Sequence, residues 1–219
     1  MVTVASEESF LKSIKEPGKT EKPLPKGEAK RPLLIVFRHG ETFYNREKLF
    51  CGKFDSLLTP EGKRQAEVLR DKLVEIPIDN GIIAPLSRCR ESLTIALGSR
   101  SEIPQRPEPL IYERDYGSLT GKSKEALYRE SPQMALEYRR SWEIRPPGGE
   151  SLQDVWQNRV EIFCQETEKA TRQNNSATII CCTNNTMRLI RMYFEKLTIP
   201  QMLELENPLA QDYCLYHLP

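Results

Sequence analysis

An arginine and a histidine stand side by side where an apolar stretch of the chain ends. Five consecutive apolar residues, 33–37, are followed directly by Arg38 and His39. A guanidinium group binds phosphate oxygens well, and an imidazole can act as a nucleophile or as an acid or base. The pair therefore indicates phosphoryl chemistry at His39, although most histidines that end a strand only form local hydrogen bonds.

The element that positions this pair is predicted to be a buried strand, because residues 33–37 are all apolar and include β-branched members. In open α/β sheets, ligands bind at the carboxyl ends of the strands, and His39 lies at such an end. A helix beginning at Thr42 or Asn45 would direct its free N–H groups to the same place. That arrangement favours an anionic ligand.

Strands and helices alternate along the rest of the chain. Thr59 followed by Pro60 predicts the start of a helix that runs to about Val74. Further strands are expected at 76–84 and 176–182. Further helices are expected at 123–141 and 186–196, and two more are expected to begin near Ser87 and Glu150. Ser87 could cap the helix that begins there. This alternation without repeats predicts the α/β class, as a three-layer α/β/α domain with a mainly parallel sheet.

The length of 219 residues suits a single domain, which we place at residues 32–219. Residues 1–31 precede it as an arm rich in proline, glycine and charged side chains, and such a composition is typical of a disordered segment. Residues 6–15 could form one or two amphipathic turns. A solvated tail is the favoured interpretation of the arm, and a docking or oligomer-contact segment is the alternative.

The net charge of +1 gives no general reason to expect nucleic acid or an acidic membrane as a partner. The chain has no apolar stretch of membrane-spanning length and no signal-peptide core, so a cytoplasmic location is expected. Its six cysteines have no CxxC spacing, and it contains only two histidines. We therefore expect no metal site, and we expect the thiols to be reduced.

The stretch from Arg38 to Asn45 resembles the signature of the histidine phosphatase superfamily. Two further motifs agree with it in the same order along the chain: Leu58-Thr59-x-x-Gly62 and Arg88. Other stretches resemble the cofactor-dependent phosphoglycerate mutase branch of that family: Phe50–Asp55, Glu113–Gly121, Arg139–Ser141 and Pro146–Leu152. The resemblance covers the chain from about Leu33 to its end and implies a phosphoglycerate mutase-like fold.

The resemblance implies that His39 is the nucleophile that becomes phosphohistidine and that Arg38 and Arg88 hold the oxygens of the transferring group. Glu113 corresponds to the family's general acid and base. The implied contacts with substrate and phosphate are Thr42, Asn45, Cys51, Gly52, Tyr116, Lys124, Arg139, Arg140, Thr183, Asn184 and Asn185. A true mutase would use 2,3-bisphosphoglycerate to prime His39, and the resemblance implies no metal and no permanently bound cofactor.

The sequence departs from the family pattern after the last predicted strand. Thr183 stands where the family has its second catalytic histidine, and Asn184 replaces a glycine. The other histidine of the chain, His217, lies two residues from the C-terminus and is not expected to compensate. A threonine hydroxyl is neutral and shorter than an imidazolium, and the loss of one preorganised donor typically lowers a rate by about 10²–10³.

The leading hypothesis is phosphoglycerate mutase-like phosphoryl transfer through His39 on a small phosphorylated metabolite, with reduced activity. Such an enzyme would be an isomerase of glycolysis. A pseudoenzyme that binds a phosphorylated ligand or partner without turnover is one alternative. A phosphatase acting on another phosphoester is the second, because water in place of the missing imidazole could intercept phosphohistidine. A homo-oligomer is left open.

Overall fold

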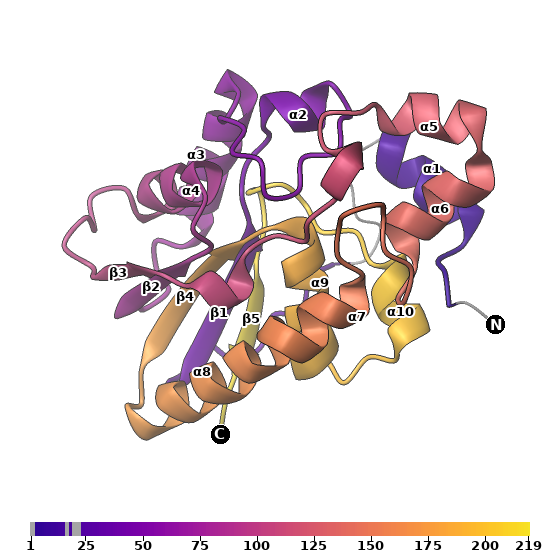
Figure 1. Cartoon of the computed structure of the whole chain (residues 1–219). Coiled ribbons are helices and arrows are strands. Elements are labelled where there is room, and N and C mark those ends of the chain that lie inside the picture. Colours follow the sequence, from indigo (N-terminus) through magenta and orange to yellow (C-terminus); the bar gives the residue numbers. More distant parts are fainter. Residues whose placement is uncertain (1–2, 16–17, 19–22) are drawn as a thin grey trace.

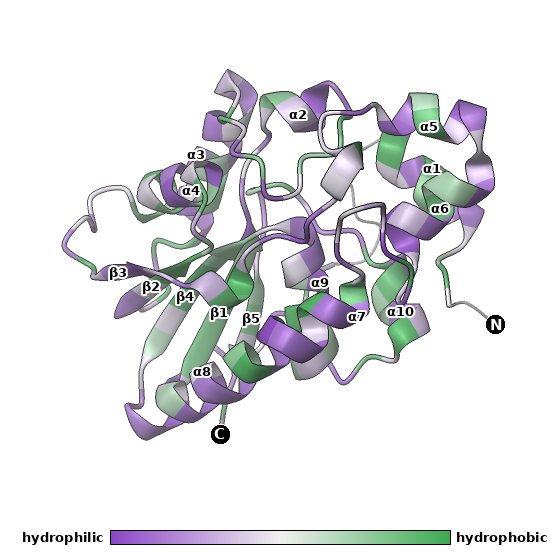
Figure 2. Cartoon of the chain, in the orientation of Figure 1, coloured by the Kyte–Doolittle hydropathy of each residue, from purple (hydrophilic) through white to green (hydrophobic). Residues whose placement is uncertain are grey.

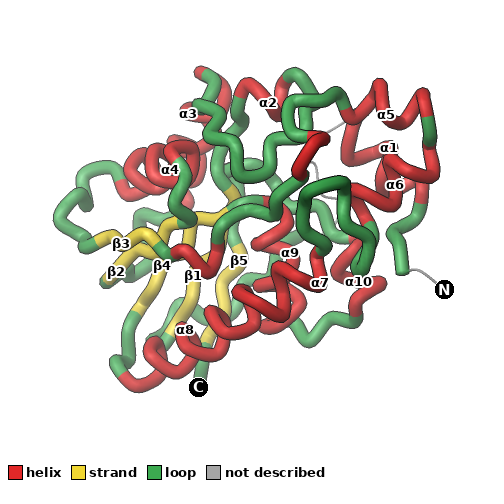
Figure 3. Tube along the Cα trace, viewed as in Figure 1, coloured by secondary structure: helices red, strands yellow, loops and turns green. Residues whose placement is uncertain are grey.

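A five-stranded sheet forms the centre of the computed structural model, which describes residues 3–15, 18 and 23–219. Its strands are β1 (Leu33–Arg38), β2 (Asn80–Ile83), β3 (Gln105–Pro107), β4 (Ala177–Cys182) and β5 (Cys214–His217). Their order across the sheet is β3-β2-β4-β1-β5 (Figures 1 and 3). All neighbouring pairs are parallel except β1 and β5, so the predicted mainly parallel sheet is confirmed.

Helices cover both faces of this sheet and give the predicted three layers (Figure 1). The pair α3 and α4 lies on one face, whereas α8 and α9 lie on the other. The α-helices are α1 (Glu7–Lys15), α2 (Phe43–Arg46), α3 (Pro60–Lys72), α4 (Ser87–Leu97), α5 (Lys124–Glu130), α6 (Pro132–Arg140), α7 (Leu152–Val155), α8 (Glu161–Gln173), α9 (Asn184–Phe194) and α10 (Ile199–Glu204). Two short 3₁₀ helices, η1 (Pro109–Ile111) and η2 (Gly117–Leu119), and a π-helical turn, η3 (Trp156–Val160), complete the set.

The central strands are mostly apolar because both of their faces are covered (Figure 2). Every residue of β1 and of β4 is buried. Within this pair Arg38 is the register partner of Cys182, and the His39 N–H donates to the Cys182 carbonyl at 3.1 Å. The residues that follow these two strands, His39 and Thr183, therefore emerge next to each other at the carboxyl edge of the sheet.

The loop after β1 is held tightly against the start of α3. Thr59 caps this helix, as predicted, by accepting a hydrogen bond from the Gly62 N–H at 3.0 Å. A Cβ atom on Gly62 would lie 2.1 Å from the Glu41 carbonyl oxygen, and one on Gly40 would lie 2.2 Å from the Gly62 carbonyl oxygen. Both positions therefore require glycine, because the two backbones touch here.

Three local predictions need correction. The second strand is Asn80–Ile83 rather than 76–84, and α9 begins at Asn184 rather than near Thr186. The prediction that Ser87 caps α4 is also wrong: Ser87 is the first helical residue, and its N–H and hydroxyl donate to Asp55 at 3.0 and 2.9 Å. A distant carboxylate thus takes the place of a local cap.

Part of the region expected to be a disordered arm forms α1. Phe10 and Ile14 are buried and pack against Ala135 of α6, and the Phe10 and Tyr128 ring centroids are 5.5 Å apart. This helix differs from the expected solvated tail because its apolar residues recur with helical spacing and meet an apolar surface on α5 and α6. None of the helices in the described ranges combines the length and apolar character that a membrane crossing requires.

Substitution of Gly62 by alanine is expected to destabilise the protein by about 1–3 kcal/mol, because the new methyl group must push the Glu41 backbone away from α3. Chemical denaturation measures this difference. Lys63→Ala is the matched control, since it changes an exposed residue of the same helix and should stay within about 0.5 kcal/mol of the parent. Equal stability of the two variants would contradict the close approach of the two backbones.

Candidate active site

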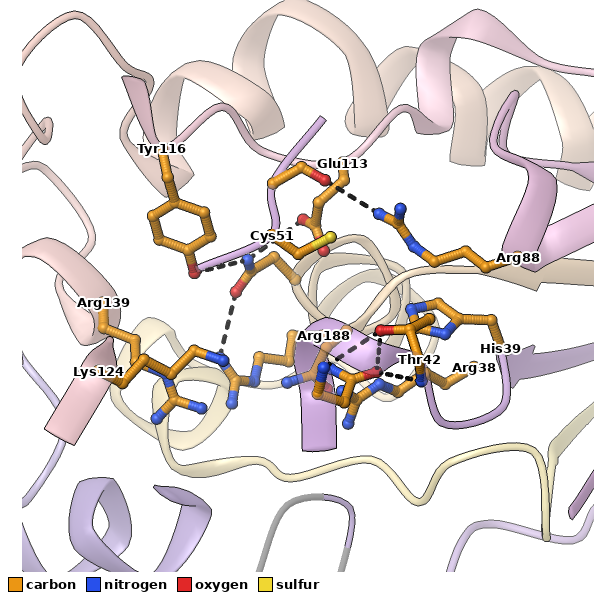
Figure 4. A pocket seen from close by; sticks show the side chains of 14 residues that line it. Arg38, His39, Thr42, Cys51, Arg88, Glu113, Tyr116, Lys124, Arg139 and Arg188 are labelled. Carbon is orange, nitrogen blue, oxygen red and sulfur yellow. Dashed lines mark hydrogen bonds between the residues drawn. The ribbon is translucent and has the colours of Figure 1, made fainter. Parts of the chain in front are cut away.

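A polar pocket lies at the carboxyl ends of β1 and β4. Loops and helices from other parts of the chain complete its wall. The pocket contains about 510 Å³ of empty space, counted together with its opening to solvent. The 14 lining residues are Arg38, His39, Thr42, Asn45, Cys51, Gly52, Arg88, Glu113, Tyr116, Lys124, Arg139, Asn184, Asn185 and Arg188 (Figure 4).

His39 is buried at the base of this pocket with one ring nitrogen occupied. Its Nδ1 lies 2.7 Å from the Gly40 carbonyl oxygen, so the proton of a neutral ring belongs on Nδ1 and Nε2 keeps its lone pair. Burial, followed by the charges of Arg88 and Arg38, holds the pKa of His39 well below its usual 6.5. The imidazole is therefore neutral at pH 7, which is the form that a nucleophile needs.

Two buried arginines flank His39, and the backbone of neighbouring loops fixes both. Arg88 donates to the carbonyl oxygens of Phe54 and Gly52 at 2.7 and 2.9 Å. Arg38 donates to the Asn207 carbonyl oxygen at 3.0 Å. Among the described residues, the Nε atoms of Arg38 and Arg88 are two of the few buried side-chain donors without a partner. An anion bound beside His39 can accept from them.

Glu113 supplies the carboxyl group of the pocket. One of its oxygens accepts from the Arg114 N–H at 2.7 Å and from the Asn185 side-chain amide at 3.2 Å. The same amide donates to the Tyr116 hydroxyl at 3.2 Å. Asn185 thus connects the carboxyl and the phenol, and it orients both toward the space above His39.

The loop after β1 and the short α2 form a second fixed wall. Thr42 and Asn45 make a capping box in which the Asn45 N–H donates to the Thr42 hydroxyl at 3.2 Å and the Thr42 N–H donates to Asn45 Oδ1 at 3.1 Å. Opposite them, Gly52 has a φ of +55°, which favours glycine, and its carbonyl holds Arg88. Cys51 lies beside it, and burial raises the pKa of its thiol.

Further basic groups gather at the other end of the pocket. Figure 4 shows Lys124 and Arg139 on the side away from His39 and Arg88. Burial, together with the nearby charges of Arg139 and Arg38, lowers the pKa of Lys124 to about 7. Arg139 also contacts α1, because it donates to the Ser13 hydroxyl and lies over the Phe10 ring. The pocket therefore offers positive charge at both ends.

Two of the predicted contacts do not line the pocket. Arg140 points away from it and donates to the carbonyl oxygens of Leu203 and Leu205 at 2.8 and 3.1 Å. Thr183 is fully buried and donates to the Thr186 hydroxyl at 3.1 Å. Neither side chain touches the pocket in this arrangement, because one holds a loop behind the pocket and the other closes the first turn of α9.

His217 lies far from His39, in keeping with the expectation that it does not compensate for the missing histidine. It pairs with Leu33 at the start of β1, whereas His39 follows the end of that strand. Its Nδ1 lies 3.0 Å from the Lys30 carbonyl oxygen. Apart from Arg140 and Thr183, the predicted site residues line one pocket, although they come from segments widely separated in the chain.

Two functional candidates were missed in the sequence. Arg188 lines the pocket and donates to the Asn185 side-chain oxygen at 3.3 Å. Arg188 follows Asn185 by three residues on the same helix, so the two side chains are neighbours on its surface. This spacing could have indicated that Arg188 belongs to the site. Glu206 lies in the loop after α10 and accepts from several arginines. The sequence gives no signal for it, because it is a single acidic residue in an irregular segment.

Comparison with known proteins identifies a family and several relatives. Residues 34–217 match the model of the histidine phosphatase superfamily (branch 1). The 2,3-bisphosphoglycerate-dependent phosphoglycerate mutase of Nitrobacter hamburgensis is 34% identical over 179 residues, which are 80% of this chain and 86% of that protein. The 2,3-bisphosphoglycerate-dependent phosphoglycerate mutase 1 of Arabidopsis thaliana is 29% identical, over 93% of this chain and 70% of that protein.

Solved structures share the fold at lower sequence identity. A putative alpha-ribazole-5'-P phosphatase from Escherichia coli superposes with a TM-score of 0.72 and 21% identity, over 85% of this chain and 95% of that one. A mycobacterial glucosyl-3-phosphoglycerate phosphatase in complex with VO3 superposes with a TM-score of 0.71 and 20% identity, over 84% of this chain and 92% of that one. At these identities the likeness shows the fold alone.

The lowered pKa of His39 is expected to appear in the pH dependence of stability. Between 6.5 and the lower folded pKa, the unfolded chain binds one more proton than the folded chain at this residue. Stability should therefore fall as the pH falls through this window, by up to about 1.4 kcal/mol per pH unit. Denaturation from pH 7.5 to 5.5 should give a shallower loss for His39→Gln than for the parent.

His217→Gln is the matched control, because it removes the only other histidine of the chain and leaves His39 in place. It should keep the parent slope. Equal slopes for the parent and His39→Gln would contradict a buried neutral imidazole at His39.

Proposed function

Because the chain belongs to the histidine phosphatase superfamily, whose members include mutases and phosphatases that transfer phosphoryl groups, we propose that it transfers a phosphoryl group through a phosphohistidine at His39. One observation carries the proposal. His39 is a neutral, buried imidazole between Arg38 and Arg88, and the Nε atoms of both arginines lack partners. A tetrahedral anion fits this combination of one lone pair and two donors.

The proposed reaction has two steps. The Nε2 lone pair of His39 attacks phosphorus, the bond to the leaving oxygen breaks, and Glu113 gives that oxygen a proton. An incoming hydroxyl then loses its proton to Glu113 and its oxygen attacks phosphorus, which breaks the bond between phosphorus and Nε2 and returns the lone pair to His39. Arg38 and Arg88 stabilise the charge on the phosphoryl oxygens in both steps, because their guanidinium groups are fixed before the ligand arrives.

The substrate proposed is a small metabolite with two anionic groups, as in phosphoglycerate. The second group would bind Lys124, Arg139 and Arg188 while the first lies beside His39. The lowered pKa of Lys124 supports this assignment, since an anion placed there would restore its charge. Under this proposal 2,3-bisphosphoglycerate primes His39, as the names of the similar mutases suggest for those proteins.

Hydrolysis of another phosphoester is the second candidate function. It is favoured by Thr183, which stands beside His39 without contributing a charged donor to the pocket. Water could then take the place of the incoming hydroxyl. A chain that binds the ligand without turnover is the third reading, and the experiments below separate it from the other two.

We expect the protein to become phosphorylated on histidine when it is incubated with labelled 2,3-bisphosphoglycerate. The label should remain with the denatured protein, be stable in base and be lost in acid. His39→Gln should abolish it, whereas His217→Gln should retain it, because that histidine lies at the opposite end of β1. An unlabelled parent chain would overturn the proposal. Release of the label to phosphoglycerate or to water would distinguish mutase from phosphatase.

Thr183→His is expected to raise the turnover number by about 10²–10³, because a ring N–H beside His39 would add a hydrogen-bond donor for the phosphoryl oxygens. Steady-state kinetics on phosphoglycerate and on an aryl phosphate measures the change. Thr186→Val is the control, since it removes the hydroxyl that Thr183 contacts and adds no donor. Activity that appears only in Thr183→His would identify the natural chain as a binding protein. Unchanged turnover would contradict the expectation that threonine at position 183 lowers the turnover number.

A further inference from the structure

Glu206 lies behind the pocket and gathers basic groups from three parts of the chain. Its Oε1 accepts from Arg38 at 3.3 Å and from the Asn184 side-chain amide at 3.4 Å. Its Oε2 accepts from Arg140 at 2.8 Å and from Arg188 at 2.9 Å. One carboxylate thus contacts the arginine next to the proposed nucleophile, the first turn of α9 and the end of α6.

The carboxylate stays on the far side of the groups that it holds. Arg38, Asn184 and Arg188 line the pocket, whereas Glu206 does not. Its side chain is only 12% exposed, and its contact with Arg38 leaves Arg38 Nε without a partner. Glu206 thus holds the guanidinium group of Arg38 from behind, while Arg38 lines the pocket.

The positive charges around the pocket explain why the carboxylate of Glu206 is needed behind it. The described lining carries Arg38, Arg88, Lys124, Arg139 and Arg188, but Glu113 is its only carboxylate. Buried like charges repel one another strongly in a medium of low polarity. Arg188, Arg140 and Arg38 in turn lower the pKa of Glu206 to about 2, so it stays ionised near neutral pH.

We propose that Glu206 is a positioning residue that holds Arg38 and Arg188 in the orientation that receives the anionic groups of the ligand. Arg188 is fixed on three sides, by Glu206, by Asn185 and by the Leu205 carbonyl oxygen at 2.8 Å. Because Glu206 also holds Arg140, the neighbour of Arg139, it connects the two charged ends of the pocket. This inference rests on the proposed function, because it explains how the arginines of that site are held in place for ligand binding.

The test measures the affinity of the full chain for orthovanadate, which mimics a transferring phosphoryl group, by calorimetry below the unfolding temperature. Glu206→Gln keeps the shape and removes the charge. We expect it to weaken binding by about 10- to 100-fold, as is typical when a group that holds a metal-binding side chain in place is lost. The kcat of a turnover assay should fall with it, because Arg38 contacts the reacting group.

Glu195→Gln is the matched control. It cuts another partly buried ion pair of α9, in which Arg191 Nε lies 2.7 Å from Glu195, and neither residue lines the pocket. This variant should lose stability without losing vanadate affinity. If Glu206→Gln behaves in the same way, Glu206 is only structural and the positioning role is overturned.

Double-mutant cycles identify the arginine through which Glu206 acts. When Arg38→Met or Arg188→Met is already present, Glu206→Gln should weaken binding much less than in the parent, because the group that it orients is gone. Full additivity in both backgrounds would overturn the proposal. Failure of the parent chain itself to bind vanadate would overturn the proposed function as well, and this outcome differs from parent binding that Glu206→Gln leaves unchanged.

Discussion

The concentration of buried positive charge around one histidine is the constraint on which the rest of this structure depends. Guanidinium groups cannot be taken out of water unless other groups replace its hydrogen bonds. Here the replacements are largely backbone carbonyls. Arg88 is held by Gly52 and Phe54, and Arg140 by the turn after α10. Loops that look irregular in the ribbon are therefore shaped by the arginines that they surround.

This arrangement also sets the chemistry of His39. Burial makes a positive charge on the imidazole unfavourable, and the neighbouring cations Arg88 and Arg38 act in the same direction. The ring stays neutral, as the proposed attack on phosphorus requires, and the same cations favour an anionic ligand beside it. A single cluster thus supports two requirements of phosphoryl transfer, which are an available lone pair and stabilisation of charge on the transferred group.

The segments that surround the pocket differ in how they are anchored. The end at His39 rests on the pairing of β1 with β4 and on the close contact of Gly40 with Gly62, which leaves the backbone little freedom to move. The other end rests on α5 and α6, and α1 packs against these helices through Phe10. The helix α1 therefore supports the wall of the site from behind, since Arg139 lines the pocket and also contacts α1.

Much of the fold and of the site follows from local sequence patterns. Apolar strands, the Thr59–Pro60 helix start and the position of Arg38 and His39 after a strand depend on short-range preferences, which can be read residue by residue. Those patterns placed Arg38 and His39 at the carboxyl edge of the sheet, where the ends of parallel strands meet. Most other site residues were implied by the resemblance to the family.

Tertiary structure alone decided which polar groups face one another. Arg139 and Arg140 are neighbours in the chain, yet one lines the pocket and the other holds a loop behind it. Glu206 gains its place because α10 returns the chain to the arginines. Such pairings depend on which long side chains can share a buried space, and this is a property of the packed molecule rather than of any segment.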